Sequence, residues 1–128
     1  MNPETKFRKK VCGLIDKLPN SFGFSIQQLA IVGTPDKFYC INGWAVVPEL
    51  KASEDAHRHP MQIYNLNRIN KAGGFGFFLF PENWDMAYNF MKFLSSEKGR
   101  LHDHTKLRAI AGPHVLPGHF KTSACDID

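Results

Sequence analysis

Two acids and a lysine lie on neighbouring segments of the chain, in an arrangement that suits phosphodiester chemistry. Asp36 follows Pro35 at the start of one strand-like segment, and Glu49 and Lys51 lie at the end of the next. Residues two apart on a strand point to the same face, so Glu49 and Lys51 share the face of Val47. Such a pair is costly to bury unless it is used or neutralised. Two carboxylates and an ammonium at one sheet edge favour metal-assisted cleavage of a phosphodiester.

A predicted β-hairpin brings these residues together. Strands are predicted over 37–41 and 44–50, and the Asn42-Gly43 dipeptide between them is a strong hairpin signal. Antiparallel pairing about this turn makes the two acids near neighbours. Pro48 within the later strand predicts an edge position or a local bulge.

The other elements follow from apolar periodicity and from glycine and proline. Helices are predicted over Pro3–Leu18, Pro60–Lys71 and Pro81–Ser96, and further strands over Phe24–Val32 and Phe75–Phe80. The last strand follows a helix, so we expect it to join the sheet parallel to the strand before that helix. The fold class expected is α/β: a mixed four-stranded sheet flanked by helices, in the order α-β-β-β-α-β-α. We expect a single domain over 1–128, with a core over about 3–96 and an irregular tail over about 99–128.

Two polar residues lie on the inward faces of predicted helices. Glu4 continues the apolar stripe that includes Phe7, and Gln62 shares a face with Leu66 and Ile69. Glu4 could bind a metal or a metal-bound water. Gln62 could hydrogen-bond a phosphate or hold the lysine in place.

Each of these residues also has a purely structural interpretation. Asp36 could belong to a turn at a strand start, and Glu49 and Lys51 could form a surface pair of little energetic value. Glu4 could complement a helix N-terminus, and Gln62 could be a polar residue near a cap.

Composition places the chain among basic globular domains. It has 128 residues, is 43% hydrophobic and carries a net charge of +4, which is compatible with a polyanionic partner. Phosphate contacts are expected from basic residues on the first helix and around the second: Lys6, Arg8, Lys9, Lys10, Arg58 and Lys71. The alternative for the run on the first helix is an ordinary solvated face.

Cysteine and histidine usage gives no sign of a zinc site or a disulfide framework. The three cysteines, Cys12, Cys40 and Cys125, are scattered, and the histidines of 57–59 and 102–104 are interpreted as solvated loop residues. The polar N-terminus does not resemble a secretory leader, and no apolar run is long enough to span a bilayer. We therefore expect a reducing cytoplasm and no membrane partner.

The ordered set of residues resembles the PD-(D/E)xK nuclease superfamily, and within it the VRR-NUC and Holliday-junction resolvase-like branches. The resemblance rests on Glu4, Gly33-x-Pro35-Asp36, Glu49-x-Lys51, and Gln62 before Ala72-Gly73-Gly74 and an apolar strand, and covers roughly Glu4 to Phe80. It implies a restriction-endonuclease-like core with Mg²⁺, or Mn²⁺ in its place. The metal ligands would be Asp36, Glu49, the backbone carbonyl of Leu50 and Glu4. Lys51 would be the catalytic lysine, with Glu4 and Gln62 in support. Pro48 departs from the family pattern, in which a β-branched residue is usual.

The resemblance implies a Mg²⁺-dependent endodeoxyribonuclease that acts on branched or otherwise structured DNA as a homodimer, in the cytoplasm of a bacterium or encoded by a phage. A second enzyme hypothesis is a nicking or homing-type endonuclease with a short sequence preference. Two alternatives without catalysis are a nucleic-acid-binding accessory that keeps the fold and a plain interaction domain.

Overall fold

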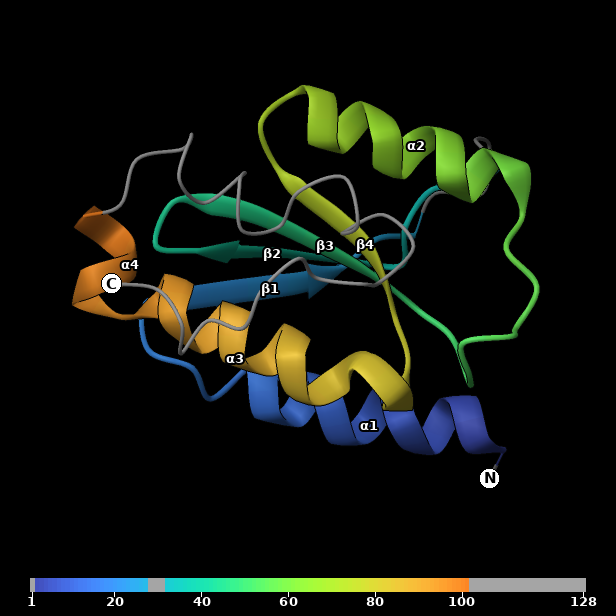
Figure 1. Ribbon diagram of the computed structural model, residues 1–128, viewed down its shortest axis with the longest axis horizontal. Coiled ribbons are helices and arrows are strands. Elements are labelled where there is room, and N and C mark those ends of the chain that lie inside the picture. The colour runs from blue at the N-terminus through green and yellow to red at the C-terminus, as the bar shows by residue number, and fades with distance from the viewer. Residues whose placement is uncertain (1, 28–31, 102–128) are drawn as a thin grey trace.

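The fold is a mixed β-sheet covered by helices on both faces (Figure 1). The structure, a computed structural model, describes residues 2–27 and 32–101. Its elements are α1 (Pro3–Ile15), β1 (Ser21–Ser25), β2 (Lys37–Ile41), β3 (Trp44–Leu50), α2 (Pro60–Lys71), β4 (Phe75–Leu79), the 3₁₀ turn η1 (Pro81–Asn83), α3 (Trp84–Ser95) and α4 (Glu97–Leu101). The predicted α/β class and element order are confirmed, with η1 and α4 in addition.

The sheet has the strand order β1-β2-β3-β4. β3 pairs antiparallel with β2 and β4 pairs parallel with β3, as predicted. β1 pairs antiparallel with β2 at the edge of the sheet. Asn42 and Gly43 have φ angles of 50° and 86°, the left-handed conformation that a tight hairpin turn requires of both central residues. This turn fixes the register between β2 and β3.

Pro48 does not lie on an edge strand, because β3 has a neighbour on each side. Pairing between β2 and β3 runs from Ile41–Trp44 to Tyr39–Val46, and so ends two residues before Pro48. The missing N–H of the proline therefore interrupts no bond of that ladder.

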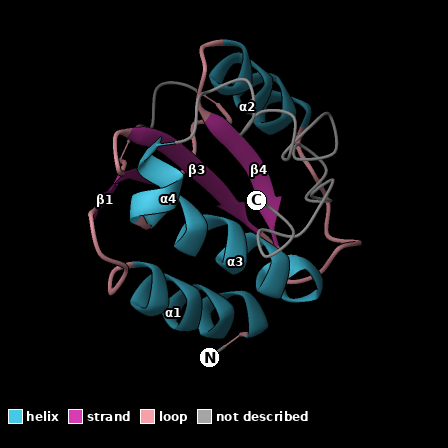
Figure 2. Cartoon of the chain, turned by 60° about the vertical axis from the view of Figure 1, so that its left-hand side comes forward, coloured by secondary structure: helices cyan, strands magenta, loops and turns pink. Residues whose placement is uncertain are grey.

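Helices α1 and α3 cover one face of the sheet, and α2 covers the other (Figures 1 and 2). Alternate residues of β4 supply both cores: Phe77 packs with α1 and α3, whereas Phe78 packs with Leu66 of α2. Val47 belongs to the core under α2. Because the side-chain period of a strand is two, Glu49 also faces α2.

The first strand was predicted over Phe24–Val32, and this is wrong: β1 begins at Ser21 and ends at Ser25. Asn20 precedes it with a positive φ of 57°, and its backbone carbonyl accepts a hydrogen bond from Asn42, so the strand starts opposite the hairpin turn. Residues 28–31 of the predicted strand lie outside the described part of the chain.

The other boundaries differ by a turn or less. Helix α1 ends at Ile15 instead of Leu18, β4 ends at Leu79, and the third predicted helix begins as the 3₁₀ turn η1. Asn2 caps α1 as expected, since its side chain accepts a hydrogen bond from the backbone N–H of Thr5 at 2.8 Å. The prediction of an irregular tail from about residue 99 is wrong at its start, because α4 continues to Leu101. The rest of that tail, with Cys125 and the 102–104 histidines, lies outside the described residues. Within the described ranges, no helix combines the length and apolarity needed to cross a membrane.

Candidate active site

Glu49 is a buried carboxylate near the end of β3. Its side chain is 6% exposed, and it lies opposite Phe78 of β4 in the parallel register. Burial raises its pKa from 4.5 to about 7, and the negative charge of Asp36 adds to this rise. Lys51 and Arg8 act in the opposite direction. The ionised form is therefore incompletely compensated by its surroundings.

The two carboxylate oxygens of Glu49 differ in their partners. Oε1 accepts a hydrogen bond from Nε2 of Gln62 at 3.1 Å. Oε2 is buried, and no described residue hydrogen-bonds to it. A buried polar atom without a partner is rare and points to strain, to a role in catalysis or to a ligand.

Gln62 joins the site to the start of α2. Its Oε1 accepts hydrogen bonds from Nζ of Lys51 at 2.9 Å and from the backbone N–H of His59 at 3.0 Å. Its Nε2 faces Glu49, so one amide satisfies two donors and one acceptor and its orientation is determined. His59 is the N-cap residue of α2, and its Nδ1 accepts from the backbone N–H of Met61 at 3.1 Å. The sequence interpretation of His59 as a solvated loop residue missed this capping role.

Asp36 lies at the start of β2 and is exposed. Its Oδ2 is 2.9 Å from Nη2 of Arg8 on α1, and its backbone carbonyl accepts a hydrogen bond from Ile26 at 2.7 Å. Extending the β2–β3 register beyond Tyr39–Val46 places Asp36 opposite Glu49. The negative charge of Asp36 is among the causes that raise the pKa of Glu49.

A glycine fixes the segment that carries Asp36. Gly33 has a φ of 79°, and a Cβ at this position would lie 2.5 Å from the backbone carbonyl carbon of Met61 in α2. The chain can therefore approach the first turn of α2 only because this residue has no side chain. The backbone leading to Asp36 and the helix carrying Gln62 are packed together at this point.

Lys51 lies just beyond β3. Its backbone N–H donates to the carbonyl of Leu79 at 2.8 Å, which continues the pairing with β4. Described peptide bonds are all trans, so the carbonyl of Leu50 points the opposite way, toward the side of the sheet from which Asp36 comes. Nζ of Lys51 also lies 6.0 Å from the ring centroid of Phe78.

Glu4 is exposed, so the prediction that it continues the inward stripe of α1 is wrong. The buried face of this helix begins at Phe7, one turn later. Glu4 lies in the first turn, where an acid complements the positive end of the helix. Its charge nevertheless contributes to raising the pKa of Glu49, which places it at the same end of the molecule.

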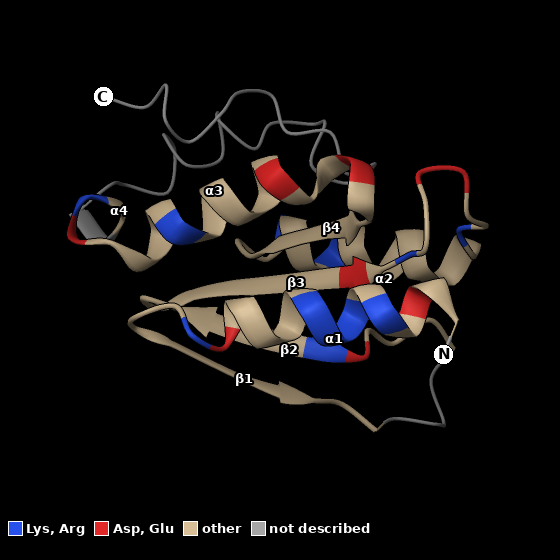
Figure 3. Ribbon diagram, turned by 90° about the horizontal axis from the view of Figure 1, so that it is seen from below, with Lys and Arg blue, Asp and Glu red and all other residues tan. Residues whose placement is uncertain are grey.

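The predicted phosphate-binding residues do not form one group. Lys6, Lys9 and Lys10 are exposed along α1, which is rich in positive charge (Figure 3). Arg8 of the same helix instead pairs with Asp36. Lys71 lies in the last turn of α2, at the end opposite to Gln62.

Arg58 lies beside the site, in the loop before α2. Its guanidinium carbon is 4.7 Å from the ring centroid of Phe78 and 5.5 Å from that of Phe80. Its Nη2 donates to the carbonyl of Glu54 at 3.2 Å. Lys51 lies near the same ring, so two cationic side chains, Arg58 and Lys51, contact Phe78. Both lie on the side of the sheet that Glu49 faces.

The donor set fits a divalent cation, although the described residues contain no group of three or more His, Cys, Asp and Glu side chains that could hold a metal. Mg²⁺ is commonly bound by one or two carboxylates and retains several waters, so such a group is not required. Glu49 offers a buried oxygen without a partner among the described residues, and Asp36 offers a second carboxylate. The carbonyl of Leu50 points toward the side of the sheet from which Asp36 comes. A cation there would offset the desolvation that raises the pKa of Glu49.

Sequence reasoning missed the ion pair of Arg8 and Asp36 and the hydrogen bond from Gln62 to Glu49. Neither pair shares a local pattern, since the partners are 28 and 13 residues apart. The opposite charges of Arg8 and Asp36 were the signal that the sequence offered for the first pair.

Comparison of the chain with models of protein families, with curated proteins and with solved structures found no match.

Proposed function

We propose that the chain is a metal-dependent endonuclease that hydrolyses phosphodiester bonds in DNA, with the restriction-endonuclease-like core of the PD-(D/E)xK nucleases. One observation carries the proposal: Gln62 joins Lys51 to a buried Glu49 whose second oxygen has no hydrogen-bond partner among the described residues. An unpaired buried acceptor is destabilising, so a ligand explains this oxygen better than a purely structural role does.

Each residue of the site has a defined role in this proposal. Asp36, Glu49 and the Leu50 carbonyl would hold the cation, with Mg²⁺ or Mn²⁺ as the candidates. When bound, a divalent cation supplies charge that stabilises the reacting phosphate and makes a water molecule more acidic. Lys51, held by Gln62, would stabilise negative charge on the phosphate or orient the attacking water. Glu4 is exposed at the same end, so we assign it a supporting role through water.

DNA is the proposed substrate because exposed cations lie along α1, on the helix that also carries Arg8 to the site. Lysines on a helix surface bind phosphates without regard to base sequence. We therefore propose recognition of DNA shape, with branched DNA such as a four-way junction as the preferred form.

A homodimer is also part of the proposal. β1 is an edge strand, and its Phe22 and Phe24 are 70% and 49% exposed. Exposed apolar edge strands favour pairing with another chain. Sedimentation of the Phe22→Ser variant should show a monomer if this edge joins the two copies; a dimer of unchanged stability would exclude this surface.

Incubation with single-stranded, duplex, flap and four-way-junction DNA, each with Mg²⁺ or EDTA, tests the function. We expect cleavage with Mg²⁺ only, and a fall of about 10²–10³-fold in rate for Lys51→Ala. Lys92→Ala is the matched control, because Lys92 is an exposed lysine near the end of α3 that stacks on Tyr88. Cleavage in EDTA, or an undiminished rate in Lys51→Ala and Asp36→Asn, would refute the mechanism. Tight junction binding without cleavage in any divalent metal would instead favour a non-cleaving binding protein.

A further inference from the structure

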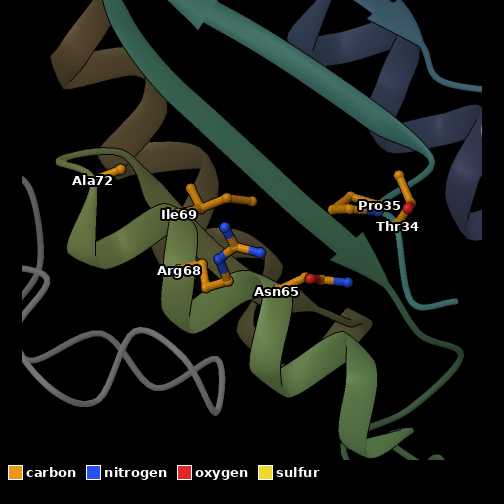
Figure 4. Close-up of a pocket in the computed structure, with 6 residues that line it drawn as sticks. All are labelled: Thr34, Pro35, Asn65, Arg68, Ile69 and Ala72. Atoms are coloured by element: carbon orange, nitrogen blue, oxygen red, sulfur yellow. The ribbon is translucent and has the colours of Figure 1, made fainter. Parts of the chain in front are cut away.

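A groove next to the candidate site has the chemistry of a phosphate-binding subsite. We call it the α2 groove; it has a volume of about 380 Å³ and is open to solvent (Figure 4). It is lined by Thr34, Pro35, Asn65, Arg68, Ile69 and Ala72. This volume is within the range of small-molecule sites.

Both walls of the α2 groove lead directly to the candidate site. One wall is the segment that ends at Asp36, and the other is α2, whose first turn carries Gln62. Asn65 lies one turn beyond Gln62, and its Nδ2 donates to the carbonyl of Val32 at 3.3 Å, which joins the two walls. Arg68 lies six residues beyond Gln62, about 9 Å along the helix axis. A strand held at the candidate site could therefore continue into the groove.

The lining combines one cation with apolar surface. Arg68 is exposed and is the charged residue of the lining, and no hydrogen bond or ion pair ties its side chain to another described residue. Its guanidinium carbon lies 5.7 Å from the ring centroid of Tyr64, one turn earlier and 53% exposed. Figure 4 shows the side chains of Arg68 and Ile69 on the side of α2 that faces Pro35. An arginine beside apolar surface can bind a phosphate while the attached sugar packs on the wall.

We infer that the α2 groove binds the cut strand next to the cleaved bond, with Arg68 on one phosphate. This inference rests on the proposed function and adds the path of the substrate to it. At a rise of about 3.4 Å per nucleotide in one strand, 9 Å of helix places that phosphate within roughly three nucleotides of the cut.

The first experiment measures binding without cleavage. Dissociation constants for a labelled four-way junction are measured in EDTA over a series of salt concentrations, for the wild type, Arg68→Gln and Lys92→Gln. Loss of one phosphate contact should weaken binding about ten-fold and reduce the slope of log affinity against log salt by about 0.7–0.9 in Arg68→Gln. Lys92→Gln loses the same charge outside the groove and should keep the wild-type slope. Arg68→Lys keeps the charge and should also keep the slope.

The second experiment locates the phosphate. A single uncharged methylphosphonate is moved along the cut strand, one position at a time, and single-turnover cleavage is measured with Mg²⁺. The wild type should be slowed at one position within about three nucleotides of the cut, and Arg68→Gln should be insensitive at that same position.

The two proposals fail in different ways. If the wild type cuts and Arg68→Gln keeps both the salt slope and the methylphosphonate sensitivity of the wild type, the α2 groove is not a strand site although the nuclease proposal survives. If the wild type never cuts but the slope of Arg68→Gln is reduced in EDTA, the nuclease proposal fails and the groove remains a phosphate site.

Discussion

Replacement of Glu49 by glutamine is expected to stabilise the protein at alkaline pH in the absence of divalent cations. Burial, reinforced by the charge of Asp36, raises the pKa of Glu49 from 4.5 to about 7. Because the pKa is higher in the folded state, the protonated carboxyl favours folding. This stability is fully present below about pH 4.5 and is lost as the pH rises through about 7. At about 1.4 kcal/mol for each pKa unit, the ionised Glu49 lowers the free energy of unfolding by about 3 kcal/mol above pH 8.

The Glu49→Gln variant removes this penalty while nearly preserving shape. Its amide oxygen can still accept the hydrogen bond that Gln62 donates at 3.1 Å. Urea unfolding of both proteins between pH 5 and 8.5, in EDTA, measures the difference in free energy of unfolding. The difference should rise from less than about 1 kcal/mol at pH 5 to about 2–3 kcal/mol at pH 8.5. Other titrating groups cancel, because both proteins contain them.

A divalent cation should reverse the comparison. At pH 8.5, Mg²⁺ at 100 times its dissociation constant should stabilise the wild type by about 2.7 kcal/mol and leave Glu49→Gln nearly unchanged. At pH 5.5 a proton competes for the same carboxylate, so the cation should stabilise the wild type less. A stability difference that does not vary with pH would refute the desolvation argument, and equal stabilisation of both proteins by Mg²⁺ would exclude Glu49 as a ligand.

Further predictions concern the residues that position Asp36. Gly33→Ala should slow cleavage and lower the free energy of unfolding, measured in urea, by about 1–3 kcal/mol, because the new Cβ would collide with Met61. Gly13→Ala is the matched control in α1, where no atom lies within 4 Å of the new Cβ. It should raise the free energy of unfolding by about 0.5–1 kcal/mol. Equal effects of the two alanines would contradict the packing argument. Arg8→Gln should change the free energy of unfolding by less than about 1 kcal/mol, because the ion pair is solvent-exposed, but it should tighten Mn²⁺ binding measured by calorimetry, since the guanidinium no longer competes for Asp36. Unchanged Mn²⁺ affinity would show that the ion pair does not restrict access to the carboxylate.

The parts of the fold that were predictable are those in which local chemistry permits a single answer. The Asn42-Gly43 turn requires positive φ at both residues, so the bounds of β2 and β3 followed from it. Helix α2 begins at Pro60, which suits the first helical position, and ends at Lys71, shortly before Gly73 with its positive φ. In contrast, the Phe24–Val32 segment contains no glycine or proline, and the next such residue is Gly33, so no local signal marked the end of β1 at Ser25. The register of β1 is set by its pairing with β2, which no local signal encodes.

Some connections within the candidate site followed from the sequence, such as the contact of Gln62 with Lys51, whereas others did not. Strand alternation placed Glu49 on the face covered by α2, and the hairpin brought Asp36 near it. The hydrogen bond from Gln62 to Glu49 depends on where α2 lies against the sheet, which only the tertiary structure determines. The inward position predicted for Glu4 was wrong because helical spacing alone does not show where a buried face begins. In α1 the buried face begins at Phe7, so Glu4 lies beyond the end of the core.

The double role of Gln62 links assembly of the site to the local opening of a helix end. The amide that holds Lys51 and Glu49 also closes the capping box on His59, so unwinding the first turn of α2 would release both side chains together. Helix termini open more readily than helix centres, and amide hydrogen exchange measures that opening. The backbone N–H groups of Gln62 and Ile63 both donate to the carbonyl of His59, at 2.9 and 3.2 Å. Their exchange rates would therefore report the fraction of molecules in which the site is assembled, before any substrate or metal is added.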